Sequence, residues 1–176
     1  MSVFDVPAMH LPARRRIFET VSKFPGLHFR EVQRRTGIGT GALEYHVRVL
    51  EKAGVIKVEK KWFGLRFYPK NIGDSESALL SILHSGNYRN TLLFLLNNPS
   101  ASQGQIAAHV GVTPSTMSWY LRKLLAMSVV KGERYGKETR YRVIDAQSLA
   151  KTLNTFKSSF LDKSVDNFLK TWEGLF

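Results

Sequence analysis

The 176-residue chain contains no cysteine. This excludes disulfide scaffolds, thiolate metal sites and cysteine nucleophiles, and it suits a reducing compartment. No apolar run approaches the roughly 18 to 20 residues that span a bilayer. The N-terminal stretch MSVFDVPAMHLPARRR also lacks the charged start and long apolar segment of a signal peptide. We therefore expect a soluble cytoplasmic protein without a membrane partner.

Sequence signatures of catalysis are absent as well. The histidines show no HExxH or other ligand spacing, and the chain has no Walker A loop, GxSxG or GxGxxG motif. No acidic pair lies in an obvious cleft-forming loop. His46 follows Tyr45 in a predicted helix, where we interpret it as a core-edge or DNA-facing residue. We expect no enzymatic activity, no catalytic residue, no cofactor and no bound metal.

Acidic residues are scarce relative to basic ones: 14 Asp and Glu stand against 26 Lys and Arg, which gives a formal net charge of +12. Such an excess favours a polyanionic partner, either nucleic acid or an anionic membrane surface. A hydrophobic share of 43% indicates a globular chain. Its length suits one medium domain or two small ones.

The chain contains an internal repeat with an offset of 74 residues and no gaps from about residue 16 to residue 69. Apolar positions agree along both copies. Eight pairs are identical: Pro25/Pro99, Gly37/Gly111, Arg48/Arg122, Leu50/Leu124, Val55/Val129, Lys57/Lys131, Glu59/Glu133 and Arg66/Arg140. The ungapped register and the shared apolar pattern make chance an unlikely explanation.

Each copy predicts the same order of elements. A first helix carries Ile17, Phe18 and Val21, and the second copy has Leu92, Leu95 and Leu96. A second helix, at about 30–36 or 103–110, stops at a glycine, Gly37 or Gly111. A third helix follows at 40–53 or 114–127, with one apolar stripe at i, i+4 and i+7. Two β-rich runs then predict a hairpin with Gly64 or Gly136 in its loop.

This order is that of a winged helix-turn-helix. We predict a mainly α protein with small β hairpins (α+β), built from two tandem winged helix-turn-helix domains and a C-terminal amphipathic helix. The predicted organisation is an N-terminal lead (1–12), domain 1 (13–70), a linker with a short helix capped by Ser75 (71–87), domain 2 (88–145) and the C-terminal helix (146–176). The excess positive charge lies in the repeats, +9 in 13–70 and +6 in 88–143.

The third helix of a helix-turn-helix lies in the major groove, and residues near its N-terminus reach base edges. In the second copy Thr113 is a natural N-cap and Pro114 a natural first helical residue. The candidate DNA-binding residues here are Thr113, Ser115, Thr116, Ser118, Trp119, Arg122 and Lys123. The alternative is that the hydroxyl residues only cap the helix.

The third helix of the first copy begins with smaller residues, and we expect Gly39 at its N-cap. The DNA-binding candidates are Thr40, Gly41, Glu44, Tyr45 and Arg48. The Glu44 carboxylate is able to accept a hydrogen bond from cytosine N4. The alternative for Glu44 is an ion pair with Arg48 one turn later. We expect the second copy to read bases more than the first.

Cations in the hairpins and in the first two helices are candidates for contacts with the DNA backbone or minor groove. In the hairpins they are Lys60, Lys61, Arg66, Arg134, Lys137, Arg140 and Arg142, and in the helices Arg14, Arg15, Arg16, Arg34 and Arg35. The alternative for the hairpin cations is protection of an exposed edge strand against aggregation.

Residues 146–176 carry apolar side chains at helical spacing: Leu149, Leu153, Phe156, Phe160, Val165, Phe168 and Trp172. Two interpretations stay open. The helix packs onto the second domain of its own chain, or it forms a homodimer.

The motif ARRRIFETVSKFPGLHFREVQRRTGIGTGALEYHVRVLEKAGVI and the hairpin after it resemble winged-helix transcriptional regulators of the MarR/ArsR-like superfamily, specifically archaeal proteins with two such domains in one chain. The resemblance covers residues 14–69 strongly and 88–143 moderately. It implies DNA-binding third helices at 40–53 and 114–127 and wings at about 59–66 and 133–140. The chain lacks the cysteines and ligand clusters of metal-sensing relatives, so a metal-sensor role is not implied.

We therefore expect a nucleoid-associated regulator of transcription that binds double-stranded DNA through both units, with the two third helices in major grooves about one turn, or a multiple, apart. A second hypothesis is a non-specific architectural or single-strand-binding protein that uses Trp62, Phe63 and Tyr135 as clamps or stacking platforms. A third is an adaptor that binds other proteins.

Overall fold

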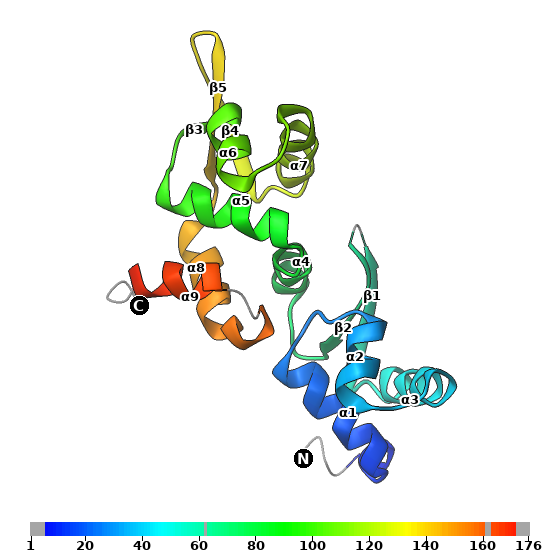
Figure 1. Ribbon diagram of the computed structural model, residues 1–176. Coiled ribbons are helices and arrows are strands. Elements are labelled where there is room, and N and C mark those ends of the chain that lie inside the picture. Colours follow the sequence, from blue (N-terminus) through cyan, green and yellow to red (C-terminus); the bar gives the residue numbers. More distant parts are fainter. Residues whose placement is uncertain (1–5, 62, 161–162, 172–176) are drawn as a thin grey trace. The chain divides into compact units, whose positions relative to one another are not determined.

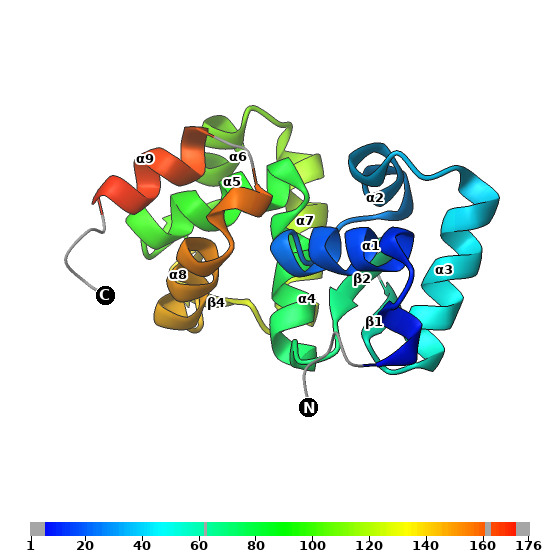
Figure 2. The ribbon, with the colours of Figure 1, turned by 90° about the horizontal axis from the view of Figure 1, so that it is seen from below.

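A computed structural model describes residues 6–61, 63–160 and 163–171. The chain divides into two compact units, residues 1–84 and 85–176. Each unit contains a helix-turn-helix followed by a β-hairpin (Figures 1 and 2). The fold class predicted from the sequence is confirmed.

Unit 1 opens with a 3-10 turn that leads into three helices, a hairpin and a fourth helix. In chain order these are the turn Pro7–Met9, α1 (Pro12–Lys23), α2 (Phe29–Thr36), α3 (Thr40–Lys52), β1 (Ile56–Lys61), β2 (Gly64–Pro69) and α4 (Asp74–Leu83). The strands β1 and β2 are antiparallel, and Ile56 lies opposite Pro69.

Unit 2 has the same arrangement, with a third strand and two C-terminal helices. In chain order these are α5 (Gly86–Asn97), β3 (Ala101–Ser102), α6 (Gln103–Val110), α7 (Pro114–Ala126), β4 (Val130–Tyr135), β5 (Glu138–Val143), α8 (Ala146–Thr155), a 3-10 turn Lys157–Ser159, and α9 (Lys163–Thr171). The strand order is β3-β5-β4, and all pairs are antiparallel.

The sequence repeat is kept element by element. The helices α5, α6 and α7 and the strands β4 and β5 begin and end 74 residues after α1, α2, α3, β1 and β2. Backbone hydrogen bonds repeat too: Gly26 N–H donates to Phe67 O at 2.8 Å, and Ser100 N–H donates to Tyr141 O at 3.0 Å. The two units are two copies of one backbone design.

Apolar stripes on the helices form the core of each unit, as their spacing predicts. In unit 1, Ile17, Val32, Leu43, Leu50 and Phe67 are at most 1% exposed and belong to one cluster. Unit 2 buries its corresponding third-helix residues, Met117, Leu121 and Leu124, to the same degree. Each such side chain contributes about 1.5–3 kcal/mol through burial, so packing against the core, rather than helix propensity, fixes the third helix.

Two glycines end the second helices in the left-handed region. Gly37 has φ 68° and Gly111 has φ 76°, and each is the C-cap residue of its helix. Glycine adopts this conformation without the steric cost that a Cβ imposes. The predicted stops are confirmed in both units.

The short helix predicted within 71–87 is present as α4, but the predicted Ser75 cap is wrong. The N-cap is Gly73, with no side-chain cap, and Ser75 is the second helical residue. The Tyr68 hydroxyl donates to the Ser77 carbonyl at 3.0 Å, and Leu80 is fully buried. The hydrogen bond from Tyr68 attaches α4 to the rest of unit 1, to which it belongs.

The prediction of one C-terminal helix over 146–176 is also wrong. This region contains two helices, α8 and α9, with a 3-10 turn between them. The turn Lys157–Ser159 separates α8 from α9, so the predicted stripe is not carried by one continuous helix. Leu149, Leu153, Phe160 and Phe168 are buried in unit 2. The described part of this stripe thus packs onto its own unit, while Trp172 lies outside the described residues. Within the described ranges, no helix is long and apolar enough to cross a bilayer.

Candidate nucleic-acid interface

The first turn of α7 carries three neighbouring hydroxyl groups. Thr113 is the N-cap, and its Oγ1 accepts a hydrogen bond from the Thr116 backbone N–H at 3.3 Å; Pro114 is the first helical residue. The same oxygen lies 3.0 Å from Ser115 Oγ and 2.9 Å from Thr116 Oγ1. The predicted cap is confirmed. Each hydroxyl combines a donor with two acceptor lone pairs, so the exposed Ser115 retains capacity for a further partner.

The outward face of α7 lies opposite the buried stripe and carries an aromatic ring and two cations. Trp119 is 53% exposed, and Arg122 is exposed beside it. The Lys123 ammonium lies 5.0 Å from the centroid of the Trp119 ring, within cation–π range. Ser118 is half-buried on the flank of the helix. Among these side chains, Trp119 and Arg122 are the most accessible to a partner.

Two tyrosines hold Trp119 in place. Tyr88 in α5 and Tyr120 in α7 have ring centroids 4.6 Å apart, and Trp119 lies 5.6 Å from Tyr120 and 6.3 Å from Tyr88. Asn87 donates a hydrogen bond to the Tyr120 hydroxyl at 2.9 Å. Burial, and next the proximity of Tyr120, raises the pKa of Tyr88 to about 12. Sequence reasoning missed both tyrosines, although the 74-residue offset aligns Tyr88 with Arg14, a predicted contact.

The start of α3 is bare by comparison. Gly39 is its N-cap, as predicted, and supplies no side-chain cap. The Thr40 hydroxyl accepts a hydrogen bond from Gln33 Nε2 at 2.8 Å. A Cβ on Gly41 would meet no atom within 4 Å, and its φ is not positive. The fold therefore does not require glycine at position 41.

A cation, a phenol and an imidazole meet on the outward side of α3. Tyr45 is 58% exposed, and the Arg14 guanidinium lies 5.9 Å from its ring centroid. Arg14 Nε donates to His46 Nδ1 at 3.4 Å, and another Arg14 nitrogen donates to Ala8 O at 3.3 Å. Burial, and next the charge of Arg14, lowers the pKa of His46. Since its Nδ1 is an acceptor, the imidazole is neutral and Arg14 carries the positive charge here.

Glu44 lies on the flank of the same face and pairs with Arg48. The carboxylate and guanidinium are 3.9 Å apart, and both side chains are more than half exposed. This is the intrahelical pair that we gave as the alternative to a contact with cytosine. An exposed i,i+4 pair contributes only about 0.3–0.5 kcal/mol, so it leaves Arg48 available to a stronger anion.

The arginines of α1 and α2 bond to the protein itself. Arg15 Nε donates to Met9 O at 2.8 Å, and Arg16 donates to Thr36 O at 3.2 Å. The Arg35 guanidinium lies 4.0 Å from the centroid of the Phe24 ring. Arg34 is 75% exposed and 3.9 Å from Glu31. Arg15, Arg16 and Arg34 stay exposed, so their contacts with phosphate remain predictions; Arg35 is half-buried and the weakest of these candidates.

The predicted wing contact of Arg66 is not supported. Arg66 is only 9% exposed, and its guanidinium donates to Gly26 O at 3.0 Å and to Phe63 O at 3.2 Å. Its counterpart Arg140 donates to Ser100 O at 3.3 Å and lies 3.8 Å from Glu138, with 43% of its side chain exposed. Both arginines tie the second hairpin strand to the loop after the first helix. This shared hydrogen bond explains why both copies of the repeat have arginine at this position.

The remaining wing cations differ in how they are held. Lys60, Lys137 and Arg134 are exposed, and Arg134 donates to Gly136 O at 3.3 Å. Arg142 lies 3.3 Å from Glu133, which is also 2.9 Å from Lys131. The bonds from Lys131 and then Arg142 lower the pKa of Glu133. Arg142 is thus partly neutralised within the wing.

Some predicted wing residues lie outside the described part of the structure, namely Trp62 and the side chain of Lys61. Of the other proposed stacking residues, Phe63 is half-buried and Tyr135 is 56% exposed. Within the described residues, no group of three His, Asp or Glu side chains is arranged to hold a metal ion.

Comparison with known proteins agrees with this architecture. Residues 12–80 match a family described as an N-terminal helix-turn-helix domain. Residues 89–131 match a family described as winged helix-turn-helix DNA-binding. The chain is 29% identical over 130 residues to an uncharacterized HTH-type transcriptional regulator of Methanocaldococcus jannaschii.

The alignment with that archaeal protein covers 74% of this chain and 33% of the relative, so the chain spans about a third of its length. Each of the two family matches falls on one of the repeated units described above. The chain thus has two tandem winged helix-turn-helix units and is similar to one archaeal protein described as an HTH-type transcriptional regulator.

Proposed function

We propose that the chain regulates transcription by binding double-stranded DNA through both winged helix-turn-helix units. The observation that supports this most is the outward face common to α3 and α7. Each helix presents an exposed aromatic ring and an exposed arginine at equivalent positions: Tyr45 and Arg48 in α3, Trp119 and Arg122 in α7. Third helices of this fold enter the major groove, where arginine reads guanine.

The two units divide the task unequally in this proposal. Unit 2 reads bases through Ser115, Thr116, Trp119 and Arg122. Unit 1 contributes more to phosphate binding, because its repeat carries 14 Lys and Arg against 5 Asp and Glu. Exposed wing cations, such as Lys60 and Lys137, follow the DNA backbone or the minor groove. The two third helices occupy major grooves about one turn, or a multiple, apart.

Selection of bound sequences from random duplex DNA tests the proposal. We expect a recovered motif, and we expect Arg122→Ala to relax preference at one position, by about 1–3 kcal/mol for a guanine contact. The matched control is Lys137→Ala, which should weaken binding to all sequences about equally. An unchanged motif with Arg122→Ala would mean that α7 is not the reading helix.

The salt dependence of affinity is a second measure of the same interface. Each phosphate that a cation neutralises releases counterions, so affinity should fall steeply between roughly 50 and 200 mM salt. A flat dependence over that range would contradict the electrostatic part of the proposal.

A non-specific or single-strand-binding protein is the second candidate. The exposed rings of Tyr45, Trp119 and Tyr135 favour it, because aromatic platforms stack on any base. Competition of the selected duplex against random duplex and random single strands separates the two candidates. Equal competition by random sequences supports this second function.

Assembly and cellular location complete the proposal. A DNA-binding regulator acts at the nucleoid in the cytoplasm. A homodimer through 146–176 stays a prediction, and the buried state of Leu149, Leu153 and Phe168 gives it little apolar surface. Sedimentation of the full chain distinguishes monomer from dimer.

A further inference from the structure

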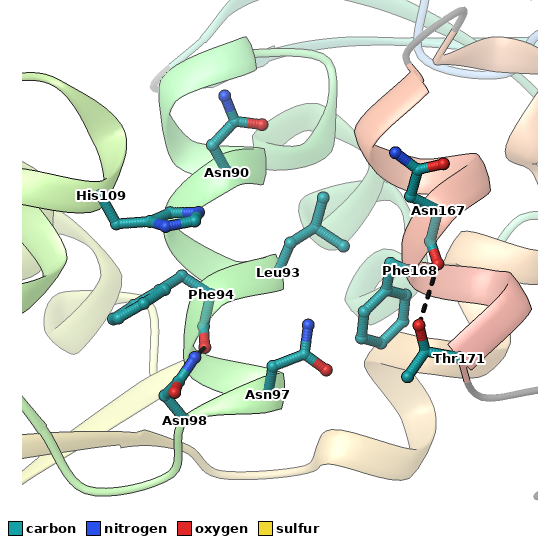
Figure 3. A pocket seen from close by; sticks show the side chains of 9 residues that line it. All are labelled: Asn90, Leu93, Phe94, Asn97, Asn98, His109, Asn167, Phe168 and Thr171. Atoms are coloured by element: carbon teal, nitrogen blue, oxygen red, sulfur yellow. Dashed lines mark hydrogen bonds between the residues drawn. The ribbon is translucent and has the colours of Figure 1, made fainter.

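Unit 2 contains a pocket of about 600 Å³ on the side of α5 that faces α9. The residues that line it come from α5, α6 and α9 and the residue after α5: Asn90, Leu93, Phe94, Asn97, Asn98, His109, Asn167, Phe168 and Thr171. Figure 3 shows side chains from α5 on one side of this space and side chains from α9 on the other. The volume falls within the range of sites for small organic ligands.

The chemistry of this lining is unusual in a chain of net charge +12. Four amides, a hydroxyl and an imidazole are combined with two phenyl rings and one leucine, and none of the nine carries a carboxylate, ammonium or guanidinium group. Each amide offers a carbonyl acceptor and two N–H donors. The walls therefore suit a neutral molecule whose edge alternates donors and acceptors.

Aromatic surfaces define the shape of that molecule. His109 in α6 stacks on Phe94 in α5, with ring centroids 4.4 Å apart and an interplanar angle of 26°. Phe168 in α9 lines the pocket from the side opposite α5 (Figure 3). Because His109 and Phe94 stack on each other, each offers only its outer face or its edge to a ligand, and such flat surfaces favour a planar ring over a branched aliphatic ligand.

One amide oxygen among the residues that line this pocket has no hydrogen-bond donor within the described protein. The Oδ1 of Asn90 is buried and accepts no hydrogen bond from any described residue. An unpaired buried acceptor costs about 1–3 kcal/mol, and native proteins satisfy nearly all such groups. By contrast, Asn98 Nδ2 donates to Phe94 O at 3.0 Å and Thr171 Oγ1 donates to Asn167 O at 3.1 Å. Asn90 thus retains a buried acceptor that the described protein leaves unpaired.

We propose that this pocket binds an uncharged planar heterocycle with hydrogen-bonding edges, of the nucleobase or nucleoside class. The ring lies among Phe94, His109 and Phe168, and the amides of Asn90 and Asn167 bond to its edge. This binding is separate from DNA binding, since it uses neutral groups on α5, α6 and α9 rather than the outward face of α7.

Saturation-transfer NMR with adenosine, guanosine, cytidine and uridine tests the proposal on the full chain without DNA. We expect transfer to the base protons of at least one nucleoside. Asn90→Leu and Asn167→Leu should each weaken its binding at least tenfold. The matched control, Asn154→Leu on the exposed surface of α8, should leave the affinity unchanged.

Thermal melting separates loss of binding from loss of fold. Asn90→Leu removes an unpaired buried acceptor, so its melting temperature should equal or exceed that of the parent chain. The proposal is overturned if no nucleoside gives transfer. It is equally overturned if the folded Asn90→Leu and Asn167→Leu variants bind as well as the parent, because binding then occurs elsewhere.

Discussion

The two units carry different side chains at equivalent positions on the first and third helices. Unit 2 has three aromatic rings there, those of Tyr88, Trp119 and Tyr120, within 6.3 Å of one another. Unit 1 has a guanidinium, a phenol and an imidazole at the positions 74 residues earlier, namely Arg14, Tyr45 and His46. The backbone beneath is the same, with element bounds that coincide at that offset.

This difference shows which residues the fold holds fixed and which it leaves free. The glycines that end the second helix recur because the backbone adopts a positive φ there. The arginines of the hairpin recur because each donates to a carbonyl in the loop after the first helix. Side chains on the outward face of the third helix meet no such requirement. Unit 2 presents three aromatic rings in contact, whereas unit 1 presents a charged group.

The loop after the first helix gives the largest expected contrast in stability. Gly26 has φ 89°, and a Cβ there would lie 2.8 Å from His84 Cδ2. Gly26→Ser should destabilise unit 1 by about 2–3 kcal/mol, because left-handed strain of roughly 1–2 kcal/mol adds to a clash. Ser100, its counterpart, already has φ 79°. Ser100→Gly should change unit 2 by less than about 1 kcal/mol, because relief of strain offsets lost chain entropy.

Amide hydrogen exchange on the full chain measures this contrast, since it reports on each unit separately. If Gly26→Ser lowers protection equally in both units, the two units unfold together. The predicted difference in stability between unit 1 and unit 2 would then be wrong.

The hairpin arginines give the next contrast. Arg66→Leu leaves the carbonyls of Gly26 and Phe63 without their donor, so we expect a loss of about 2 kcal/mol in unit 1. Arg140→Leu should cost less than about 1 kcal/mol, because this side chain is 43% exposed. Denaturant unfolding of both variants checks the ratio. Similar losses would mean that burial does not distinguish the two arginines.

The outward rings sharpen the comparison at the level of DNA binding. Trp119→Ala should weaken binding about tenfold, since stacking contributes roughly 1–3 kcal/mol per base. Tyr45→Ala should weaken it only about threefold, because the smaller ring is held by fewer aromatic neighbours. Fluorescence anisotropy with the selected duplex measures both, and Ile144→Ala, at an exposed apolar site on unit 2, is the control. The reverse order would assign the leading role to unit 1.

The smallest expected effect is a pH dependence confined to unit 1. The folded-state pKa of His46 is lowered, mainly by burial and then by Arg14, so the unfolded chain binds the proton more readily. The contribution to stability is present above the ordinary pKa of 6.5 and is lost as pH falls below it. His46→Gln should flatten this part of the stability profile between about pH 7 and pH 5. An identical profile for the variant would assign the pH dependence to another group.

Local signals in the sequence were sufficient to predict the elements of the two repeated domains. Apolar spacing around Leu43 and Met117, stops at Gly37 and Gly111 and the cap at Thr113 are short-range features, and each lies where it was predicted. Tertiary contacts decided the rest. Arg66 looked like a wing cation because its sequence neighbours are exposed lysines, and only the bridge between Leu27 and Phe67 brings it to Gly26.

The candidate site was predictable in part for the same reason. Position along α7 was enough to place Trp119 and Arg122 on the outward face. Tyr88 was missed because it lies on a different helix, and the pocket lined by Asn90 and Asn167 joins residues 77 positions apart. No short-range pattern carries information of that kind.

The constant offset between the units also has a genetic consequence. Consider a crossover between a position in the first repeat and the corresponding position in the second. It joins each helix or strand to its equivalent in the other unit, at the equivalent residue. Such an exchange deletes one domain and leaves a complete hybrid one, with its turns and loop lengths intact. Recombination within the coding sequence thus offers a direct path from a two-domain chain to a one-domain chain, or from two domains to three.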